Sequence, residues 1–245
     1  MATHIKEAIL AKEKEGRPCV LGLATGMSPL GVYKVLIDMH KRGEVSFKNV
    51  VTFNLDEYYP MKKNDLNSYN YYMHYHFFDH IDIPKENIHI PDGELSKDQV
   101  TNFCADYEAK IKHYGGIDVQ ILGIGRVGHI GFNEPPAPLK SKTRIVYLNK
   151  VTRLDASRSF GGLQNVPKSA ITMGIETIMK ARKIFVMAWS ESKQLIVQRV
   201  LEGEYSMEVP ATCLHEHPNT TFVMDLPAGE LLTRFQRPWT IKGDT

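Results

Sequence analysis

The chain has 245 residues, of which 42% are hydrophobic and 24% charged, and it carries a formal net charge of +2. This composition is typical of a globular protein with a large buried core, and it excludes a disordered chain. The net charge is near zero and the sequence contains no basic block, so we expect no nucleic-acid partner.

The N-terminal region is predicted to form a helix and then a strand. Apolar residues recur at helical spacing over Thr3–Glu15, and Gly16 stops the helix. The continuous apolar run Cys19–Ala24 predicts a buried strand. Because the chain begins directly in a helix, we expect it to be a segment of a longer polypeptide.

A glycine-containing turn, Thr25–Pro29, leads into a helix that runs to about Arg42 and stops at Gly43. Ser28 is a typical N-cap and Pro29 a typical first helical residue. The free N–H groups and the positive end of the helix dipole at such a turn favour a bound anion. The turn lacks the Gly-Lys-Ser/Thr ending of a P-loop. It indicates either an anion site of another kind or an ordinary loop.

Two adjacent acids follow the next predicted strand, Val50–Phe53. They are Asp56 and Glu57 in the run Asn54–Tyr58. Such a pair marks either an exposed turn or a working carboxylate. In a parallel sheet this position lies at the edge where ligands bind.

Two further helices are marked by their first residues. An aromatic-rich helix over Asn67–Asp79, capped by Asn67 or Ser68, is expected to use its Tyr and His residues for packing rather than for a metal. Ser96 and Gln99 form a capping box for a helix that reaches about residue 113.

The strand Ile117–Leu122 leads into a glycine-rich loop that contains Gly125, His129 and Glu134. Glycines let this backbone approach a ligand closely. An imidazole titrates near neutral pH, and a nearby carboxylate can orient it or exchange protons with it. These residues alone leave a turn with a surface histidine as an alternative.

The segment after this loop is predicted to contain a strand over Arg144–Leu148 and then a polar stretch, Asn149–Gly162. This stretch carries Arg158 and ends in two glycines, as a mobile lid would. A short strand over Ile171–Met173 and a short helix over Glu176–Ala181 follow.

The C-terminal region is predicted to hold the strands Ile184–Trp189 and Thr220–Met224, with an irregular tail. Ser190 caps the intervening helix, which reaches about Leu201, and this places Lys193 in its first turn. A cation there is disfavoured by the helix dipole unless an anion binds or the neighbouring acid offsets it.

The alternation of strands and helices predicts an α/β fold: a doubly wound, mostly parallel sheet with helices on both faces, Rossmann-like, in one domain over residues 1–245. Thr25, Asp56, His129 and Lys193 each follow a different predicted strand at its carboxyl end. We therefore expect them to share one edge of the sheet.

The cysteines and the apolar runs of the sequence indicate where the protein is found and whether it contacts a membrane. Cys19, Cys104 and Cys213 are widely spaced, with no CxxC pair, which suits a reducing cytosol and gives no support to a metal site. No apolar run approaches the roughly 20 residues that span a membrane. We expect a cytoplasmic protein with no membrane partner.

Three motifs, spread over about residues 5–226, together resemble the glucosamine-6-phosphate deaminase family. They are Thr25-Gly26-x-Ser28-Pro29, Asn54-Leu55-Asp56-Glu57-Tyr58 and Gly128-His129-Ile130-x-Phe132-Asn133-Glu134-Pro135. The related 6-phosphogluconolactonases share the fold and a Gly-His turn but continue differently after the histidine. The resemblance implies conversion of glucosamine 6-phosphate and water to fructose 6-phosphate and ammonia, without metal or organic cofactor.

The resemblance also implies a role for each candidate site residue. Asp56 would move the proton between C2 and C1, and His129 with Glu134 would open the sugar ring. The substrate and its phosphate would be held by Thr25, Gly26, Ser28, Gly125, Arg158 and Lys193.

The chain departs from the family pattern beside the histidine. Val127 stands where many members carry an Asp, so orientation of His129 would fall to Glu134 or to a backbone group. An apolar group there should also lower the pKa of His129.

Other departures lie away from the motifs. Ala137, Pro138 and Val146 replace polar contacts with which allosteric members hold an activator, so N-acetylglucosamine 6-phosphate is not expected to activate this protein. The tail from Leu226, including Arg234–Trp239, does not follow the short family form, which again indicates a segment of a longer polypeptide.

Two alternatives to the deaminase stay open. One is a related phosphosugar enzyme, either a lactonase or an isomerase of another amino sugar. The other is a catalytically weak phosphosugar sensor, suggested by Val127. Association into a homo-oligomer is also left open.

Overall fold

A computed structural model describes residues 1–236 and confirms the α/β prediction. A six-stranded sheet has the order β4-β2-β1-β5-β8-β9, with every neighbouring pair parallel. Its strands are β1 (Cys19–Leu23), β2 (Val50–Asn54), β4 (Ile88–His89), β5 (Val119–Gly123), β8 (Lys183–Ala188) and β9 (Thr220–Met224).

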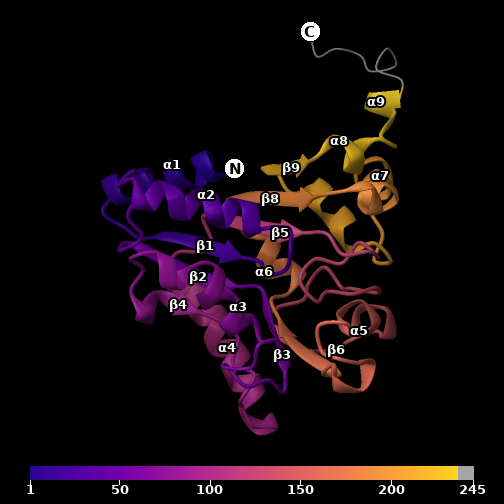
Figure 1. Ribbon diagram of the computed structural model, residues 1–245, viewed down its shortest axis with the longest axis horizontal. Helices are drawn as coiled ribbons and strands as arrows, with labels where there is room; N and C mark the ends of the chain where they lie inside the picture. The colour runs from indigo at the N-terminus through magenta and orange to yellow at the C-terminus, as the bar shows by residue number, and fades with distance from the viewer. Residues whose placement is uncertain (237–245) are drawn as a thin grey trace.

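Helices pack against both faces of this sheet, as predicted. The α-helices are α1 (Ala2–Lys14), α2 (Leu30–Lys41), α3 (Tyr69–His76), α4 (Lys97–His113), α5 (Lys150–Ala156), α6 (Ile175–Met179), α7 (Gln194–Glu202), α8 (Leu226–Gly229) and α9 (Thr233–Gln236). Short 3₁₀ turns are η1 (Phe78–His80), η2 (Lys85–Asn87), η3 (Leu163–Asn165), η4 (Glu191–Lys193) and η5 (Pro210–Glu216). Figure 1 shows α1 and α2 side by side along the upper side of the sheet.

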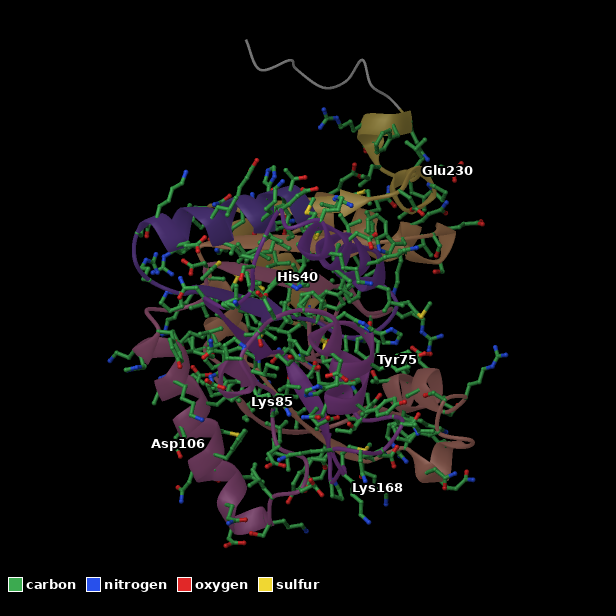
Figure 2. All side chains as sticks on the ribbon, turned by 60° about the vertical axis from the view of Figure 1, so that its left-hand side comes forward. His40, Tyr75, Lys85, Asp106, Lys168 and Glu230 are labelled. Carbon is green, nitrogen blue, oxygen red and sulfur yellow. The ribbon has the colours of Figure 1, made fainter. Side chains whose placement is uncertain are left out.

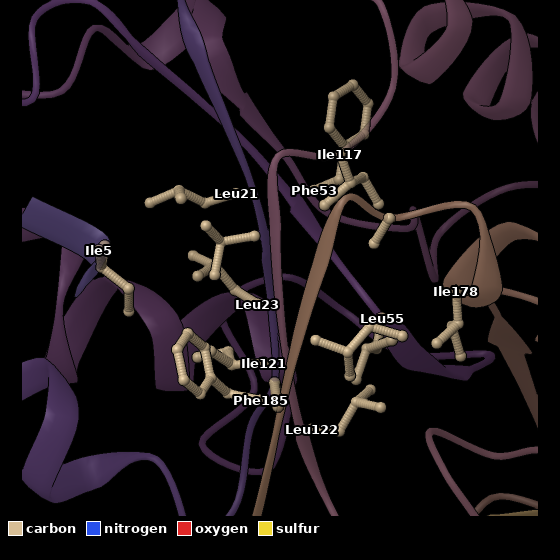
Figure 3. Close-up of a cluster of buried hydrophobic side chains, with 14 of the residues drawn as sticks. Ile5, Leu21, Leu23, Phe53, Leu55, Ile117, Ile121, Leu122, Ile178 and Phe185 are labelled. Carbon is tan, nitrogen blue, oxygen red and sulfur yellow. The ribbon is translucent and has the colours of Figure 1, made fainter. Parts of the chain in front are cut away.

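The core is divided between the two faces by the alternation of side chains along the strands. Figure 3 shows Ile121 on the same side of the strands as Ile5 of α1, and Leu122 on the side of Ile178 of α6. All four side chains are at most 1% exposed. Successive residues of a strand point to opposite faces, so uniformly apolar strands are what a doubly covered sheet requires.

The predicted strands over Arg144–Leu148 and Ile171–Met173 lie outside this sheet, and a strand over Asp56–Tyr59 was not predicted. β3 (Asp56–Tyr59), β7 (Ser169–Thr172) and β6 (Arg144–Tyr147) form a second, antiparallel sheet in the order β3-β7-β6. Figure 1 shows β3 and β6 below the main sheet, with α5 at the lower right. Along β6 the exposure alternates from residue to residue, which is the pattern of an edge strand with one covered face.

Serine caps are confirmed at two helices and wrong at two others. Ser68 accepts the Tyr71 N–H at 2.9 Å, and Ser96 donates its N–H to Gln99 at 3.1 Å. α2 begins after Pro29 without a side-chain cap. Ser190 does not cap α7: its N–H donates to the Asp225 carboxylate, and its backbone has a positive φ of 75°. The turn η4 follows Ser190, and Lys193 is the residue directly before α7.

Two segments that were predicted to be irregular contain helices. The predicted lid begins with α5, and the predicted irregular tail contains α8 and α9. Of the tail run Arg234–Trp239, residues 237–239 lie outside the described part. No helix among residues 1–236 is both long and apolar enough to cross a membrane.

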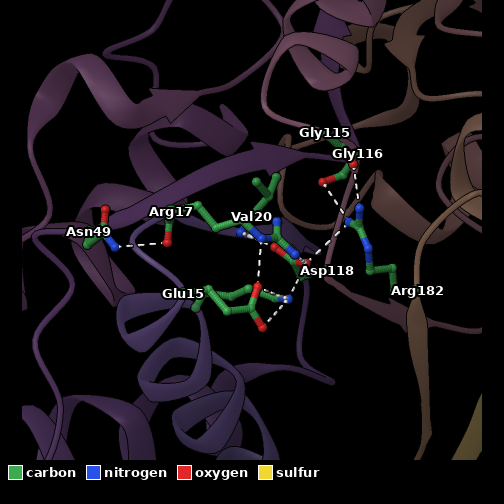
Figure 4. A network of polar contacts seen from close by, with 9 residues as sticks. Glu15, Arg17, Val20, Asn49, Gly115, Gly116, Asp118 and Arg182 are labelled. Atoms are coloured by element: carbon green, nitrogen blue, oxygen red, sulfur yellow. Dashed lines mark hydrogen bonds and ion pairs between the residues drawn. The ribbon is translucent and has the colours of Figure 1, made fainter.

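A buried acid ties the amino-terminal ends of the strands together (Figure 4). Asp118, only 4% exposed, accepts the Val20 N–H at 2.9 Å and pairs with Arg182 at 3.2 Å and Arg17 at 3.4 Å. A buried carboxylate with an N–H donor and two guanidinium partners is fully compensated. Asp118 therefore stabilises the fold.

Candidate active site

A cavity of about 180 Å³ lies where the carboxyl ends of β1, β2 and β5 meet. Its walls come from the turn after β1, from the β2–β3 junction, from the start of α3 and from the glycine-rich loop after β5. Parallel strands present their carboxyl ends at one edge, so residues far apart in sequence converge there. The predicted residues that line it are Thr25, Gly26, Ser28, Asp56, Gly125 and His129.

Asp56 is the buried acid of this cavity. It is the first residue of β3, is 6% exposed, and its carboxylate has no hydrogen bond or ion pair with any described residue. Burial, followed by the charge of Glu57, raises the pKa of Asp56 to about 8. A carboxyl group with such a pKa can hold and release a proton near neutral pH.

The neighbouring acid is held in a different way. Glu57 is 2% exposed and accepts N–H groups from Tyr58, Tyr69 and Asn70, each at 2.9 Å. It therefore satisfies the free N–H groups at the start of α3. The two acids form no exposed turn: Glu57 fixes a helix end and Asp56 is left free in the cavity.

His129 is held by the backbone of its own loop. Gly125 donates its N–H to the His129 carbonyl at 2.9 Å and accepts the Gly128 N–H at 3.0 Å. The imidazole lies so close to Gly125 that a Cβ atom there would be 1.9 Å from His129 Nε2. Burial, followed by the charge of Lys193, lowers the pKa of His129 to about 4, and Asp155 opposes this effect. The ring is neutral at pH 7.

The Glu134 side chain is hydrogen-bonded to another segment of the chain. Its Oε2 accepts the Asn149 N–H at 2.7 Å at the start of α5, and its Oε1 is buried without a hydrogen-bond partner among the described residues. His129 Nδ1 is likewise buried and unpartnered. Glu134 therefore makes no hydrogen bond to His129 in this structure, and its role in orienting the ring stays a prediction.

The two predicted cations differ in their distance from the cavity. Lys193 donates to the carbonyl of Ile124, which lines the cavity, at 2.8 Å. Arg158 is exposed, lies beyond the end of α5, and does not line the cavity. Lys193 thus contacts a residue of the cavity wall without lining the cavity itself, and neither Arg158 nor Glu134 lines it.

Two residues near the cavity were not predicted. Tyr69 lines it and stacks on Phe132 with parallel rings 5.9 Å apart. Asp155 on α5 pairs with Arg126 at 3.0 Å. Burial lowers the pKa of both His129 and Lys193, and the charge of Asp155 partly opposes this lowering. The only sequence signal for Tyr69 was its place after the Ser68 cap, and nothing local distinguished Asp155 from other surface acids.

A parallel sheet with an isolated acid, a neutral imidazole and a lysine gathered at its carboxyl edge defines a small-molecule site of the α/β enzyme class. The sequence model for glucosamine-6-phosphate isomerases/6-phosphogluconolactonase matches residues 1–223. The chain belongs to this family.

Curated relatives are similar over almost the whole chain. A glucosamine-6-phosphate deaminase of Thermoanaerobacter pseudethanolicus is 46% identical over 232 residues, which are 95% of this chain and 91% of the relative. A glucosamine-6-phosphate deaminase-like protein of Bacteroides thetaiotaomicron is 45% identical over 241 residues. The match covers 98% of this chain but only 36% of that longer relative.

Two solved structures resemble this chain to different degrees. A monomeric glucosamine-6-phosphate deaminase superposes with a TM-score of 0.89 at 42% identity, covering 94% of this chain and 93% of that one. A 6-phosphogluconolactonase from Trypanosoma cruzi reaches a TM-score of 0.76 at 18% identity, covering 95% and 91%. The second likeness shows the shared fold alone.

Proposed function

We propose that this chain is a glucosamine-6-phosphate deaminase, which converts glucosamine 6-phosphate and water to fructose 6-phosphate and ammonia. The observation that carries the proposal is the unpaired, buried Asp56 in one cavity with the neutral imidazole of His129. Relatives named for this activity are about 45% identical to the chain. With this function, the protein binds a phosphosugar substrate, has no nucleic-acid partner and works in the cytoplasm.

Ring opening falls to His129. The neutral imidazole takes the proton of the C1 hydroxyl and delivers one to the ring oxygen, which yields the open-chain aldehyde. A pKa of about 4 keeps the ring ready to accept a proton at neutral pH. Glu134 assists once its side chain leaves Asn149, and its unpartnered Oε1 supports this assignment.

Isomerisation and deamination depend on Asp56. In its charged form this acid removes the proton from C2 and returns it to C1, while the C1 oxygen gains a proton and the amino nitrogen gives one up, which converts the 2-amino aldehyde to a ketimine. Water adds at C2 of the ketimine and ammonia leaves, giving the ketone. Burial supports the role, because a carboxylate that has lost its water shell is a stronger base than one in solution.

The phosphate is held by the turn Thr25–Ser28 and by Lys193, with Arg158 joining when the segment that carries it closes over the site. We expect Lys193→Ala to weaken binding of glucosamine 6-phosphate by about 1–3 kcal/mol, the scale of a charge-assisted contact. Calorimetric titration measures this. Lys168→Ala, which removes an exposed lysine labelled in Figure 2, is the control and should bind as wild type. Equal affinities in all three proteins would place the anchor elsewhere.

The charge state of His129 provides a separate test. In an NMR titration of histidine-labelled protein, the His129 ring should titrate at about pH 4. Val127→Asp should raise this pKa, by about one pH unit, because an anion two residues away favours the imidazolium. Asp155→Asn should lower it, because the carboxylate of Asp155 now opposes the effect of Lys193. A ring that titrates at its ordinary pH in the wild type contradicts this description of the site.

The related lactonase reaction is the competing function, because 6-phosphogluconolactonases share the fold. Purified protein is given either glucosamine 6-phosphate or 6-phosphogluconolactone, and turnover and ligand-induced thermal stabilisation are measured together. We expect turnover with the amino sugar alone. Faster hydrolysis of the lactone would favour the competing function. Stabilisation by the amino sugar without turnover would indicate a sensor, since binding raises the melting temperature whether or not chemistry occurs.

A further inference from the structure

A second cavity, of about 310 Å³, lies between α3, β4 and α4. It shares no lining residue with the cavity that holds Asp56 and His129. Its wall combines apolar rings, among them Phe103 and Tyr107, with three lysines. The reaction proposed above makes no use of it.

The charge of this cavity is positive. Lys63 pairs with Asp92 at 3.0 Å, and both line the wall. Lys85 and Lys110 also line it, and neither has a carboxylate within ion-pair distance among residues 1–236. Figure 2 shows Lys85 near α4, the helix that carries Lys110. Both lysines are exposed at the rim of the cavity, and two ammonium groups without a carboxylate partner beside apolar rings favour an anionic ligand.

The wall also holds an unused hydrogen-bonding group. His89 lines the cavity and packs against Phe53 with the ring centres 4.6 Å apart. Its Nε2 is buried without a hydrogen-bond partner among the described residues. Burial, followed by the charge of Lys110, lowers the pKa of His89 to about 4. The neutral ring can therefore donate one N–H to an acceptor without itself adding charge.

Hydrogen bonds connect this wall to the catalytic strand. The Tyr107 hydroxyl donates to the carbonyl of Asn54 at 2.7 Å and lies 3.1 Å from the carbonyl of His89. On the other side of the cavity, the Asn70 N–H donates to Glu57 at 2.9 Å. Asn54 and Glu57 flank the two residues at the β2–β3 junction, one of which is Asp56. Both walls are therefore hydrogen-bonded to residues on either side of Asp56.

We propose that this second cavity, defined by Lys85, Lys110 and His89, binds a phosphate group, as free phosphate or as a small phosphomonoester, and that its occupancy changes turnover at Asp56. A phosphate dianion matches two lysine point charges and one N–H donor. The apolar rings would cover the carbon skeleton of a phosphomonoester. The binding part of this proposal is independent of the proposed reaction, and only the kinetic part depends on it.

Binding is tested by NMR on protein labelled at histidine, with the His89 signal identified by its loss in His89→Gln. Inorganic phosphate and ribose 5-phosphate are titrated separately at constant ionic strength set with sodium chloride. We expect the His89 signal to move with a Kd of about 1 mM or below, the strength of a few charge-assisted contacts. The double variant Lys85→Ala/Lys110→Ala should raise that Kd at least tenfold. Lys112→Ala, an exposed lysine of α4 outside the cavity, should leave it unchanged.

Turnover is measured with the same ligands at saturating glucosamine 6-phosphate, so that the catalytic cavity is already filled. We expect kcat to change about fivefold or more in the wild type and in Lys112→Ala, and to stay constant in the double variant. An unmoved His89 signal, or equal shifts in all variants, overturns the site. Binding at His89 with an unchanged kcat overturns the coupling to Asp56. A response to ribose 5-phosphate but not to inorganic phosphate would identify a phosphomonoester as the ligand.

Discussion

Replacing Asp56 with Asn is expected to lower kcat for glucosamine 6-phosphate deamination by a factor on the order of 10²–10⁴, the usual contribution of a positioned base. The amide keeps the volume and polarity of the buried side chain but cannot accept the C2 proton. Because the phosphate contacts are untouched, the affinity for the substrate should change little. Turnover within threefold of wild type would remove Asp56 from the mechanism.

The pH dependence supplies a second test of this acid. Since burial raises the pKa of Asp56 to about 8, the charged form grows as pH rises, and kcat/KM should increase with pH up to about 8. Thermal unfolding reports the titration of the same acid independently of turnover.

The sign of the stability effect is fixed by linkage. Between the ordinary pKa of an Asp, about 4, and its folded value of about 8, the native state binds the proton and the unfolded state does not. Asp56 therefore makes the native state lose stability as pH rises through this window. We expect Asp56→Asn to unfold at a higher temperature than wild type above pH 8. A lower melting temperature at that pH would mean that the acid is compensated by contacts absent from the structure.

Gly125→Ala is expected to reduce kcat/KM by about 10²-fold or more, the scale associated with displacing a catalytic group by an ångström or so. A Cβ atom at this position would lie 1.9 Å from His129 Nε2, so the imidazole must leave its place. Glycine is required at position 125 because the ring approaches it so closely. The backbone does not require a glycine, because φ of Gly125 is not positive.

The control for this substitution is Gly31→Ala in α2. A Cβ atom there meets nothing within 4 Å, and alanine favours a helix by up to about 1 kcal/mol over glycine. This variant should keep full activity and equal or higher stability. If Gly125→Ala also keeps full activity, His129 is not required in the position that the structure shows.

Much of the fold could be predicted because its signals are local. Buried parallel strands such as β1 and β8 read as continuous apolar runs, and the cap at Ser68 is satisfied within its own helical turn. The second sheet could not be predicted, because β3 pairs with β7 more than 100 residues further along the chain. No short-range pattern encodes a partner at that separation.

The candidate site shows the same division. The order of strands placed Thr25, Asp56 and His129 at one edge, and the structure brings all three to one cavity. Sequence could not show that Glu134 is engaged by Asn149, because a side-chain rotamer depends on packing between distant segments. For the same reason Asp155 was missed: its charge acts on His129 only once α5 is placed beside the loop.

The two buried acids at opposite edges of the sheet show why burial alone did not distinguish function. Asp118 is paired with two guanidinium groups and a backbone N–H, whereas Asp56 has none of these partners. Both residues adjoin buried strands in the sequence. Only the partners identify which acid stabilises the fold and which is free for chemistry.

The central claim is that Asp56 and His129 form the site of an amino-sugar-phosphate deaminase, and product analysis tests it most directly. Purified wild-type protein and Asp56→Asn are incubated with glucosamine 6-phosphate, and ammonia and fructose 6-phosphate are quantified in the same samples. We predict that the wild type releases the two products in a ratio of one to one and that Asp56→Asn, folded and still able to bind the substrate, releases at most about one hundredth as much of either. Absence of both products from the wild type, or their release at equal rates by the two proteins, would contradict the claim.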